Sequence, residues 1–153
     1  MKAKYKHTNI IARDWRALAK FYQRVFGCVI IPPERHLSGD WLDRGTGVRN
    51  ASFSGVHLRL PGLGKDGPTL EIYQYDRNES RPAIAANREG IGHIAFEVDD
   101  VEEAMTEVLK NGGTKVGDIT SSEVEGVGVL TFVYLADPEG NIIELQAWGS
   151  SVQ

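Results

Sequence analysis

GHIAFEVDDVEEAM, residues 92–105, joins a short alternating segment to the start of a helical pattern. Side chains alternate between the two faces of a strand, so His93 is expected on the face opposite Ile94. Asp100 is a favourable N-cap, and we expect a helix from there through Asn111, where two glycines end it. This stretch therefore predicts a strand that leads directly into a capped helix.

The same order occurs near the start of the chain in HTNIIARDWRALAKFYQRVFG, residues 7–27. His7 belongs to a strand expected over residues 4–12, and Asp14 caps a helix expected from Trp15 to Phe26. The glycine that follows is a common helix stop. Because both stretches place a histidine on a strand before a capped helix, the second half of the chain is predicted to repeat the first.

Three further strands are expected after each helix. They are predicted at residues 28–32, 50–60 and 68–75 in the first half, and at 114–118, 127–135 and 141–148 in the second. Residues 33–49 are interpreted as an irregular insertion, and the polar residues 77–90 as a linker. The chain is thus predicted to be one α+β domain, residues 1–153, of two tandem βαβββ modules, about 1–76 and 91–150.

Each half also carries a glutamate in its last expected strand, Glu71 in LEIYQY and Glu144 in NIIELQ. A carboxylate buried without a partner costs several kcal/mol, so each needs a cation or hydrogen-bond donors nearby. Taken singly, a strand histidine is often structural and a strand glutamate often solvated. The repeated pattern instead predicts that His7, Glu71, His93 and Glu144 are the ligands of one divalent metal ion.

Other side chains are candidates for a substrate pocket. Those that share the alternation of the two glutamates are Tyr73, Tyr75, Gln146 and Trp148. Trp41, in the insertion, is expected to belong to a lid. Arg49 and Arg59 could bind a substrate carboxylate or phosphate, or could equally be exposed surface residues. His36 is expected to be exposed, and His57 to lie on the surface or in a pocket wall.

Composition limits the classes of function. The chain has 17 basic and 21 acidic residues, a formal charge of −4, and no cluster of basic residues suited to nucleic acid or to an acidic membrane surface. Its one cysteine, Cys28, precludes an internal disulfide and is expected to be buried. We find no signal-peptide pattern and no apolar run of membrane-spanning length, and therefore expect a cytoplasmic protein.

Four stretches of this sequence resemble the vicinal-oxygen-chelate superfamily, which includes glyoxalase I, methylmalonyl-CoA epimerase, extradiol dioxygenases and the fosfomycin and bleomycin resistance proteins. The resemblance covers nearly the whole chain. It rests on residues 7–27, on LEIYQY (70–75), on GHIAFEVDDVEEAM with NGG (111–113), and on DPEGNIIEL (137–145). The resemblance implies two paired βαβββ modules that form an incomplete barrel around a metal site.

The ligand positions of this superfamily fall on His7, Glu71, His93 and Glu144, and a set of four is similar to that of glyoxalase I. The glutathione-dependent enzymes usually carry an arginine four residues after the first ligand and an asparagine four after the second. This chain has Ile11 and Tyr75 there, which argues against glutathione as a substrate component.

The expected chemistry is that of a lyase or isomerase acting on a small α-oxygenated carbonyl compound. The ligand set suits Zn²⁺, Ni²⁺, Co²⁺ or Mn²⁺, and Fe²⁺ less well. A bound ion would stabilise an enediolate, with Glu144 as the first candidate base and Glu71 the second. The alternatives are a methylmalonyl-CoA-epimerase-like racemase, an iron-dependent dioxygenase and a metal-free binding protein. We expect a homodimer, and the sequence leaves open whether the metal site lies within one chain or is shared across a dimer.

Overall fold

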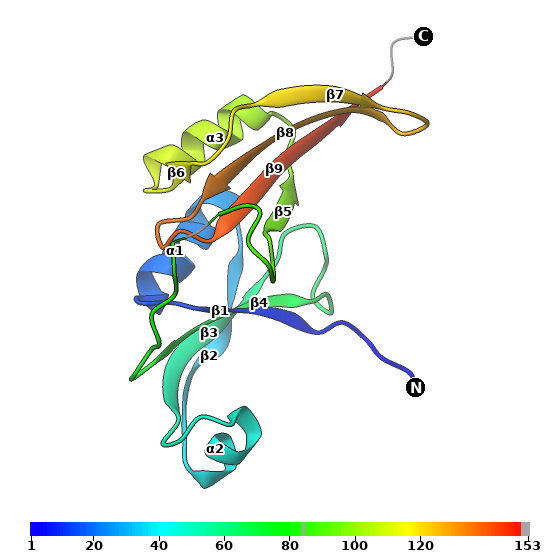
Figure 1. The fold of residues 1–153 in the computed structure, drawn as a ribbon. Helices are drawn as coiled ribbons and strands as arrows, with labels where there is room; N and C mark the ends of the chain where they lie inside the picture. The colour runs from blue at the N-terminus through cyan, green and yellow to red at the C-terminus, as the bar shows by residue number, and fades with distance from the viewer. Residues whose placement is uncertain (84, 151–153) are drawn as a thin grey trace. The chain divides into compact units, whose positions relative to one another are not determined.

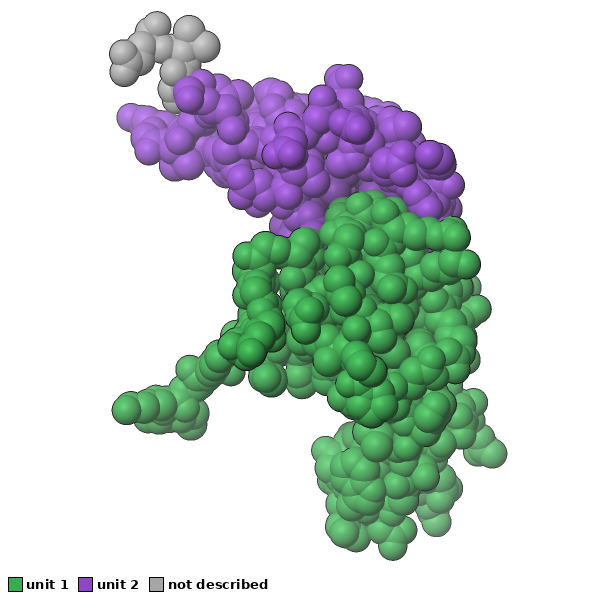
Figure 2. Space-filling model, turned by 180° about the vertical axis from the view of Figure 1, so that it is seen from behind, with its two compact units in different colours: residues 1–81 green, residues 82–153 purple. Residues whose placement is uncertain are grey.

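The protein is described here as a computed structural model that covers residues 1–83 and 85–150. The chain divides into two compact units, unit 1 over residues 1–81 and unit 2 over residues 82–153, which Figure 2 shows in different colours.

Unit 1 is a four-stranded sheet with one long helix and one short helix (Figure 1). Its elements are β1 (His7–Ile11), α1 (Trp15–Phe26), β2 (Val29–Ser38), α2 (Asp40–Thr46), β3 (Ser52–Arg59) and β4 (Thr69–Tyr75). The strand order is β1-β4-β3-β2, with β1 parallel to β4 and the other pairs antiparallel. Helix α1 packs against β3 and β4, and its Leu18 and Tyr22 are fully buried.

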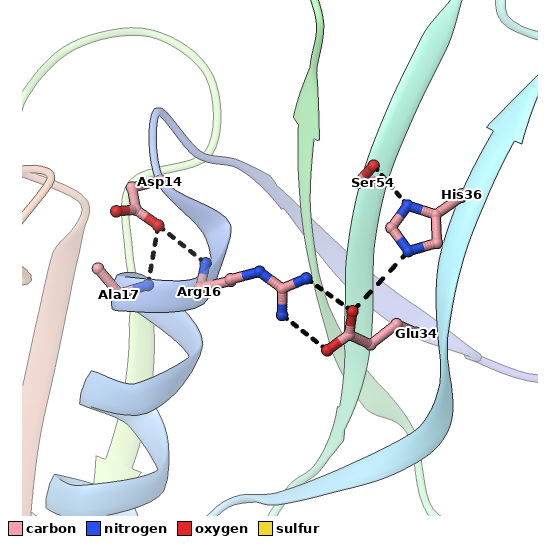
Figure 3. Close-up of polar contacts among 6 residues, drawn as sticks. All are labelled: Asp14, Arg16, Ala17, Glu34, His36 and Ser54. Atoms are coloured by element: carbon pink, nitrogen blue, oxygen red, sulfur yellow. Dashed lines mark hydrogen bonds and ion pairs between the residues drawn. The ribbon is translucent and has the colours of Figure 1, made fainter.

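Helix α1 begins and ends where the sequence predicts. The carboxylate of Asp14 accepts hydrogen bonds from the backbone N–H groups of Arg16 and Ala17, at 3.1 and 3.0 Å (Figure 3). These bonds satisfy two of the amide donors that a helix leaves free at its first turn. At the other end Gly27 adopts a left-handed conformation with φ of 66°, which a residue with a side chain rarely adopts.

The segment 33–49 is not the irregular insertion expected from its sequence. Strand β2 continues to Ser38, and residues 40–46 form α2. The register of β2 against β3 shifts between Ile31 and Arg35, where two extra residues are accommodated. Prolines 32 and 33 lie in this shift, and because proline has no N–H they leave no sheet donor unpaired. The two prolines therefore interrupt the strand pattern in the sequence, but β2 continues past them in the fold.

Unit 2 is a five-stranded sheet with one helix (Figure 1). Its elements are β5 (Ile94–Glu97), α3 (Val101–Lys110), β6 (Thr114–Lys115), β7 (Thr120–Val124), β8 (Gly128–Ala136) and β9 (Ile142–Gly149). The order is β5-β9-β8-β6, with β5 parallel to β9, and β7 also pairs with β8. Strands β6 and β7 pair with successive stretches of β8, so together they take the place that β2 has in unit 1. Two tandem βαβββ modules of an α+β fold are thereby confirmed.

Three local expectations for unit 2 were wrong. The first strand was expected over residues 92–99 and is shorter, so His93 precedes β5 instead of lying within it. Strand β7 was missed, because its sequence TSSEV is polar and almost entirely exposed. The helical spacing predicts an apolar face of α3 that includes Val101, Val108 and Leu109, but only the two valines are buried, and Leu109 is 40% exposed.

The turn between β8 and β9 is built on Asp137, which is 1% exposed. Its carboxylate accepts hydrogen bonds from the backbone N–H groups of Glu139 and Asn141, both at 2.9 Å, and from the Asn141 amide at 2.6 Å. The proline and glycine of DPEG, residues 137–140, favour a tight turn in the sequence; that turn is present, and it fixes where β9 begins. Within the described part of the chain, no helix is long and apolar enough to cross a membrane.

Candidate functional site

In unit 1 the histidine of β1 lies beside the glutamate of β4. The parallel register pairs His7 with Thr69 and Asn9 with Glu71, so these side chains share one face of the sheet. His7 Nδ1 lies 3.3 Å from Glu71 Oε1, and the Asn9 amide donates to Glu71 Oε2 at 3.2 Å. Glu71 is only 8% exposed, so this carboxylate is buried with its donors in place.

His57 contacts the same carboxylate from the other side. It is the partner of Glu71 in the β3–β4 register, and its Nε2 lies 3.1 Å from Glu71 Oε1 and 2.8 Å from the Tyr73 hydroxyl. Burial lowers the pKa of His57 and outweighs the attraction of Glu71, and the nearby positive charges of Arg35 and Lys6 act in the same direction as burial. A neutral imidazole is therefore favoured at this position.

The contact with His57 was not expected from the sequence. His57 does not fit the repeat, and its place beside Glu71 depends on the register between β3 and β4. The available signal was its alternation with Val56 and Leu58, which are both fully buried under α1 and therefore leave His57 on the other face.

The Tyr73 ring packs directly against a glycine of the neighbouring strand. Gly55 is its partner on β3, and a Cβ at Gly55 would lie 2.3 Å from Tyr73 Cδ1 and 2.0 Å from the carbonyl oxygen of Ile72. The Tyr73 ring lies over this glycine and stacks on Phe53 with a centroid distance of 4.6 Å. Burial, together with the negative charge of Glu71, raises the pKa of Tyr73, so its hydroxyl keeps its proton.

Unit 2 contains a second pair of the same kind. His93 Nε2 lies 2.8 Å from Glu144 Oε2, and the Glu144 side chain is 13% exposed. Glu144 lies between Ala95 of β5 and Tyr134 of β8 in the sheet register. The ring of Tyr134 lies 4.8 Å from that of His93, centroid to centroid. Tyr134 was missed in the sequence, although its alternation with the fully buried Val133 and Leu135 placed it on the face of Glu144.

Each predicted histidine therefore contacts the predicted glutamate of its own half. Imidazole nitrogens and carboxylate oxygens are the donors that borderline divalent ions prefer. Among residues 1–83 and 85–150, no group of three or more histidine, cysteine, aspartate or glutamate side chains is arranged to hold a metal ion. The structure thus provides two pairs with suitable chemistry, each with fewer donors than a metal site requires.

The predicted pocket residues lie in different surroundings. Tyr75 packs on Phe53 at a centroid distance of 5.0 Å, next to a buried cluster that includes Leu42 of α2. Trp41 is 56% exposed and Trp148 41% exposed. Gln146 pairs with Phe132 in the β8–β9 register. Arg59 shares the sheet face of His57, and its buried Nε has no hydrogen-bond partner among the described residues.

His36 is part of an exposed network with Ser54 and Glu34 (Figure 3). Its Nδ1 lies 2.8 Å from the Ser54 hydroxyl, and its Nε2 lies 3.8 Å from Glu34 Oε2. Arg16 donates two hydrogen bonds to Glu34, at 2.7 and 2.8 Å, which lower the pKa of Glu34 and raise that of Arg16. His36 is exposed, as expected, and helps to connect α1 with β2 and β3.

The sequence profile of the glyoxalase-like domain matches residues 7–146. The chain belongs to this family. The match confirms the resemblance to the vicinal-oxygen-chelate superfamily, which the two histidine-containing stretches and the DPEG turn had indicated. The comparison of this glyoxalase-like chain with curated proteins found no match.

Solved structures share the glyoxalase-like fold. A glyoxalase family protein from Bacillus cereus is 16% identical, with a TM-score of 0.73 over 97% of this chain and 94% of that one. A glyoxalase/bleomycin resistance protein/dioxygenase family enzyme from Burkholderia phytofirmans is 18% identical, with a TM-score of 0.60 over 96% and 100% of the two chains. A glyoxylase/bleomycin resistance protein/dioxygenase domain from Frankia is 16% identical, with a TM-score of 0.60 over 97% of this chain and 100% of that one. At these identities the comparisons establish the fold.

Proposed function

We propose that the protein is a divalent-metal-dependent lyase or isomerase that moves a proton on a small α-oxygenated carbonyl compound. The observation that carries the proposal is the pairing in each unit. A histidine in or directly before the first strand contacts the glutamate of the last strand, at 3.3 Å for His7–Glu71 and 2.8 Å for His93–Glu144. Membership of the glyoxalase-like family supports it. His7, Glu71, His93 and Glu144 would hold the ion, which is Zn²⁺, Ni²⁺, Co²⁺ or Mn²⁺ in this proposal.

When bound, such an ion supplies a Lewis acid that polarises neighbouring substrate oxygens and favours loss of the α-proton. We assign the base to Glu144. Glu71 is restrained by three side chains, His7, Asn9 and His57, which suits a fixed ligand. Glu144 contacts His93, and we take this less restrained carboxylate as the one that reaches a substrate proton.

The assignment is tested with Glu144→Gln, which keeps the shape of the side chain and removes its capacity as a base. We expect the variant to bind most of the metal that the wild-type protein binds, and to lose solvent-deuterium exchange into α-hydroxy-carbonyl and thioester substrates. Glu123→Gln is the matched control, because Glu123 is an exposed glutamate on β7 of the same unit. Unchanged exchange in Glu144→Gln would refute the role of Glu144.

The same assay separates the related reactions. Deuterium incorporated at the carbon that lost the proton, with inverted configuration, identifies a racemase, whereas deuterium at the neighbouring carbon identifies a glyoxalase-like isomerase. We do not assign glutathione to the substrate. The positions expected to bind it hold Ile11 and Tyr75, and the Tyr75 ring is packed against Phe53.

A further inference from the structure

A cavity of about 520 Å³ opens on unit 1 beside His57. Its lining includes four basic side chains, one acidic side chain and the imidazole: Lys4, Lys6, Arg35, Lys65, Asp66 and His57. Cavities of roughly 300–1,000 Å³ are typical of small-molecule sites. All of these residues belong to unit 1, so the cavity is complete within that unit.

Separate parts of the fold bring the basic side chains together. Lys4 and Lys6 precede β1, and the carbonyl of Lys6 accepts a hydrogen bond from the N–H of Thr69, at 3.1 Å. Arg35 follows the register shift in β2 and pairs with Gly55, which places it on the sheet face of His57. Lys65 comes from the loop between β3 and β4. The concentration of cations thus depends on the fold and is not a basic run in the sequence.

The charge of this cavity is opposite to that of the chain. The protein has 21 acidic and 17 basic residues, yet the lining of this cavity contains four lysine or arginine side chains and one aspartate. A cavity lined by one sign of charge concentrates ligands of the other sign. Ammonium and guanidinium groups are also the usual partners of phosphate oxygens.

We propose that this cavity binds a doubly negative group, such as a phosphate monoester, carried by the small substrate of the protein. A dianion fits better than a single carboxylate, because four cations against one aspartate leave more than one positive charge to neutralise. His57 connects the cavity to the candidate site: its Nδ1 lies 3.5 Å from the Thr69 hydroxyl in the lining, and its Nε2 lies 3.1 Å from Glu71. A substrate anchored by its anionic end therefore extends its carbonyl end toward Glu71.

The test uses inorganic phosphate and the full-length protein as purified, with no metal added. Phosphate is titrated at constant ionic strength, and the backbone ¹H–¹⁵N signals of Lys6, Arg35 and His57 are followed. We expect saturable shifts in the wild-type protein, and binding weaker by at least roughly tenfold in the double variant Lys6→Gln/Arg35→Gln. Lys20→Gln/Arg24→Gln is the matched control, since it removes the same charge from exposed positions on α1.

Equal phosphate affinity in the two double variants, or no saturable binding by the wild-type protein, overturns the proposal. Acetate at the same concentrations tests the preference for a dianion, and saturation by acetate at equal affinity also overturns it. Circular dichroism of both double variants establishes that they are folded.

The direction of the substrate rests on the proposed function, but phosphate binding is measured without metal. A protein that binds phosphate here and binds no metal under any loading would keep the anion site and lose the proposed function. A protein that binds metal but binds no phosphate would lose the anion site and keep the proposed metal-dependent function.

Discussion

Cys28 shows how burial alone sets the chemistry of one residue. It is 3% exposed, and burial raises the pKa of its thiol to about 11 from an ordinary 9.0. The thiolate is the reactive form of cysteine, so the folded protein keeps this thiol unreactive at neutral pH. Its role is that of a small apolar side chain, as the sequence predicted.

The raised pKa of Cys28 gives a pH dependence of known sign. Above about pH 9 the unfolded chain releases the thiol proton while the folded chain retains it, so stability falls as the pH rises toward 11. Between about pH 8 and pH 10 we expect wild-type protein to lose about 1 kcal/mol of unfolding free energy relative to Cys28→Ala. Urea denaturation at the two pH values measures it, and an unchanged difference between the two proteins contradicts the burial of this thiol.

At the residue scale the sequence indicated the two histidine–glutamate pairs but not their neighbours. His7, Glu71, His93 and Glu144 stand out because the pattern occurs twice. His57 and Tyr134 have no counterpart in the other half of the sequence. Each lies opposite a glutamate on the neighbouring strand, and only the strand register places it there. Register depends on hydrogen bonding between distant segments, which a local pattern does not reveal.

At the scale of elements, the pairing of β3 with β4 depends on Gly55. A methyl group there would overlap the backbone of Ile72 and the ring of Tyr73, so Gly55→Ala must shift a central strand pair. We expect a loss of about 3 kcal/mol in the free energy of unfolding. Because the Tyr73 ring would be displaced, its hydrogen bond to His57 should also be lost, which the imidazole NMR signals of His57 would report.

Gly45→Ala is the control within the same unit. Gly45 lies in α2, and a Cβ there meets nothing within 4 Å. Alanine is the better helix former, so this variant should gain roughly 0.5–1 kcal/mol. Similar effects of the two substitutions in urea denaturation would contradict the packing described for Gly55.

The elements that the sequence predicted are those with strong local signals. Helix α1 has an aspartate cap, an apolar face and a terminal glycine, and its predicted bounds agree with the structure. The end of β2, helix α2 and strand β7 were missed. Prolines interrupt the first, α2 is seven residues long with one buried side chain, and β7 is polar. Tertiary packing stabilises short elements of this kind more than their own propensity does.

At the scale of the whole molecule, the repeated module explains why the proposed ligands are split between distant parts of the sequence. Each βαβββ module sets its first strand parallel to its last, and this places a histidine beside a glutamate in both units. One pair alone provides too few donors for a tight divalent site. The central claim of the proposed function is that both pairs act on the same metal ion.

The most direct test is the metal content of the purified protein after chelation and reloading with Zn²⁺, Ni²⁺, Co²⁺ or Mn²⁺. We predict roughly one tightly bound ion per chain, lost both in His7→Ala and in His93→Ala, because removing either imidazole leaves the set incomplete. His36→Ala is the control and should keep the ion, since His36 is engaged with Ser54 and Glu34. No bound ion under any loading, or an ion retained by either His7→Ala or His93→Ala, would contradict the claim.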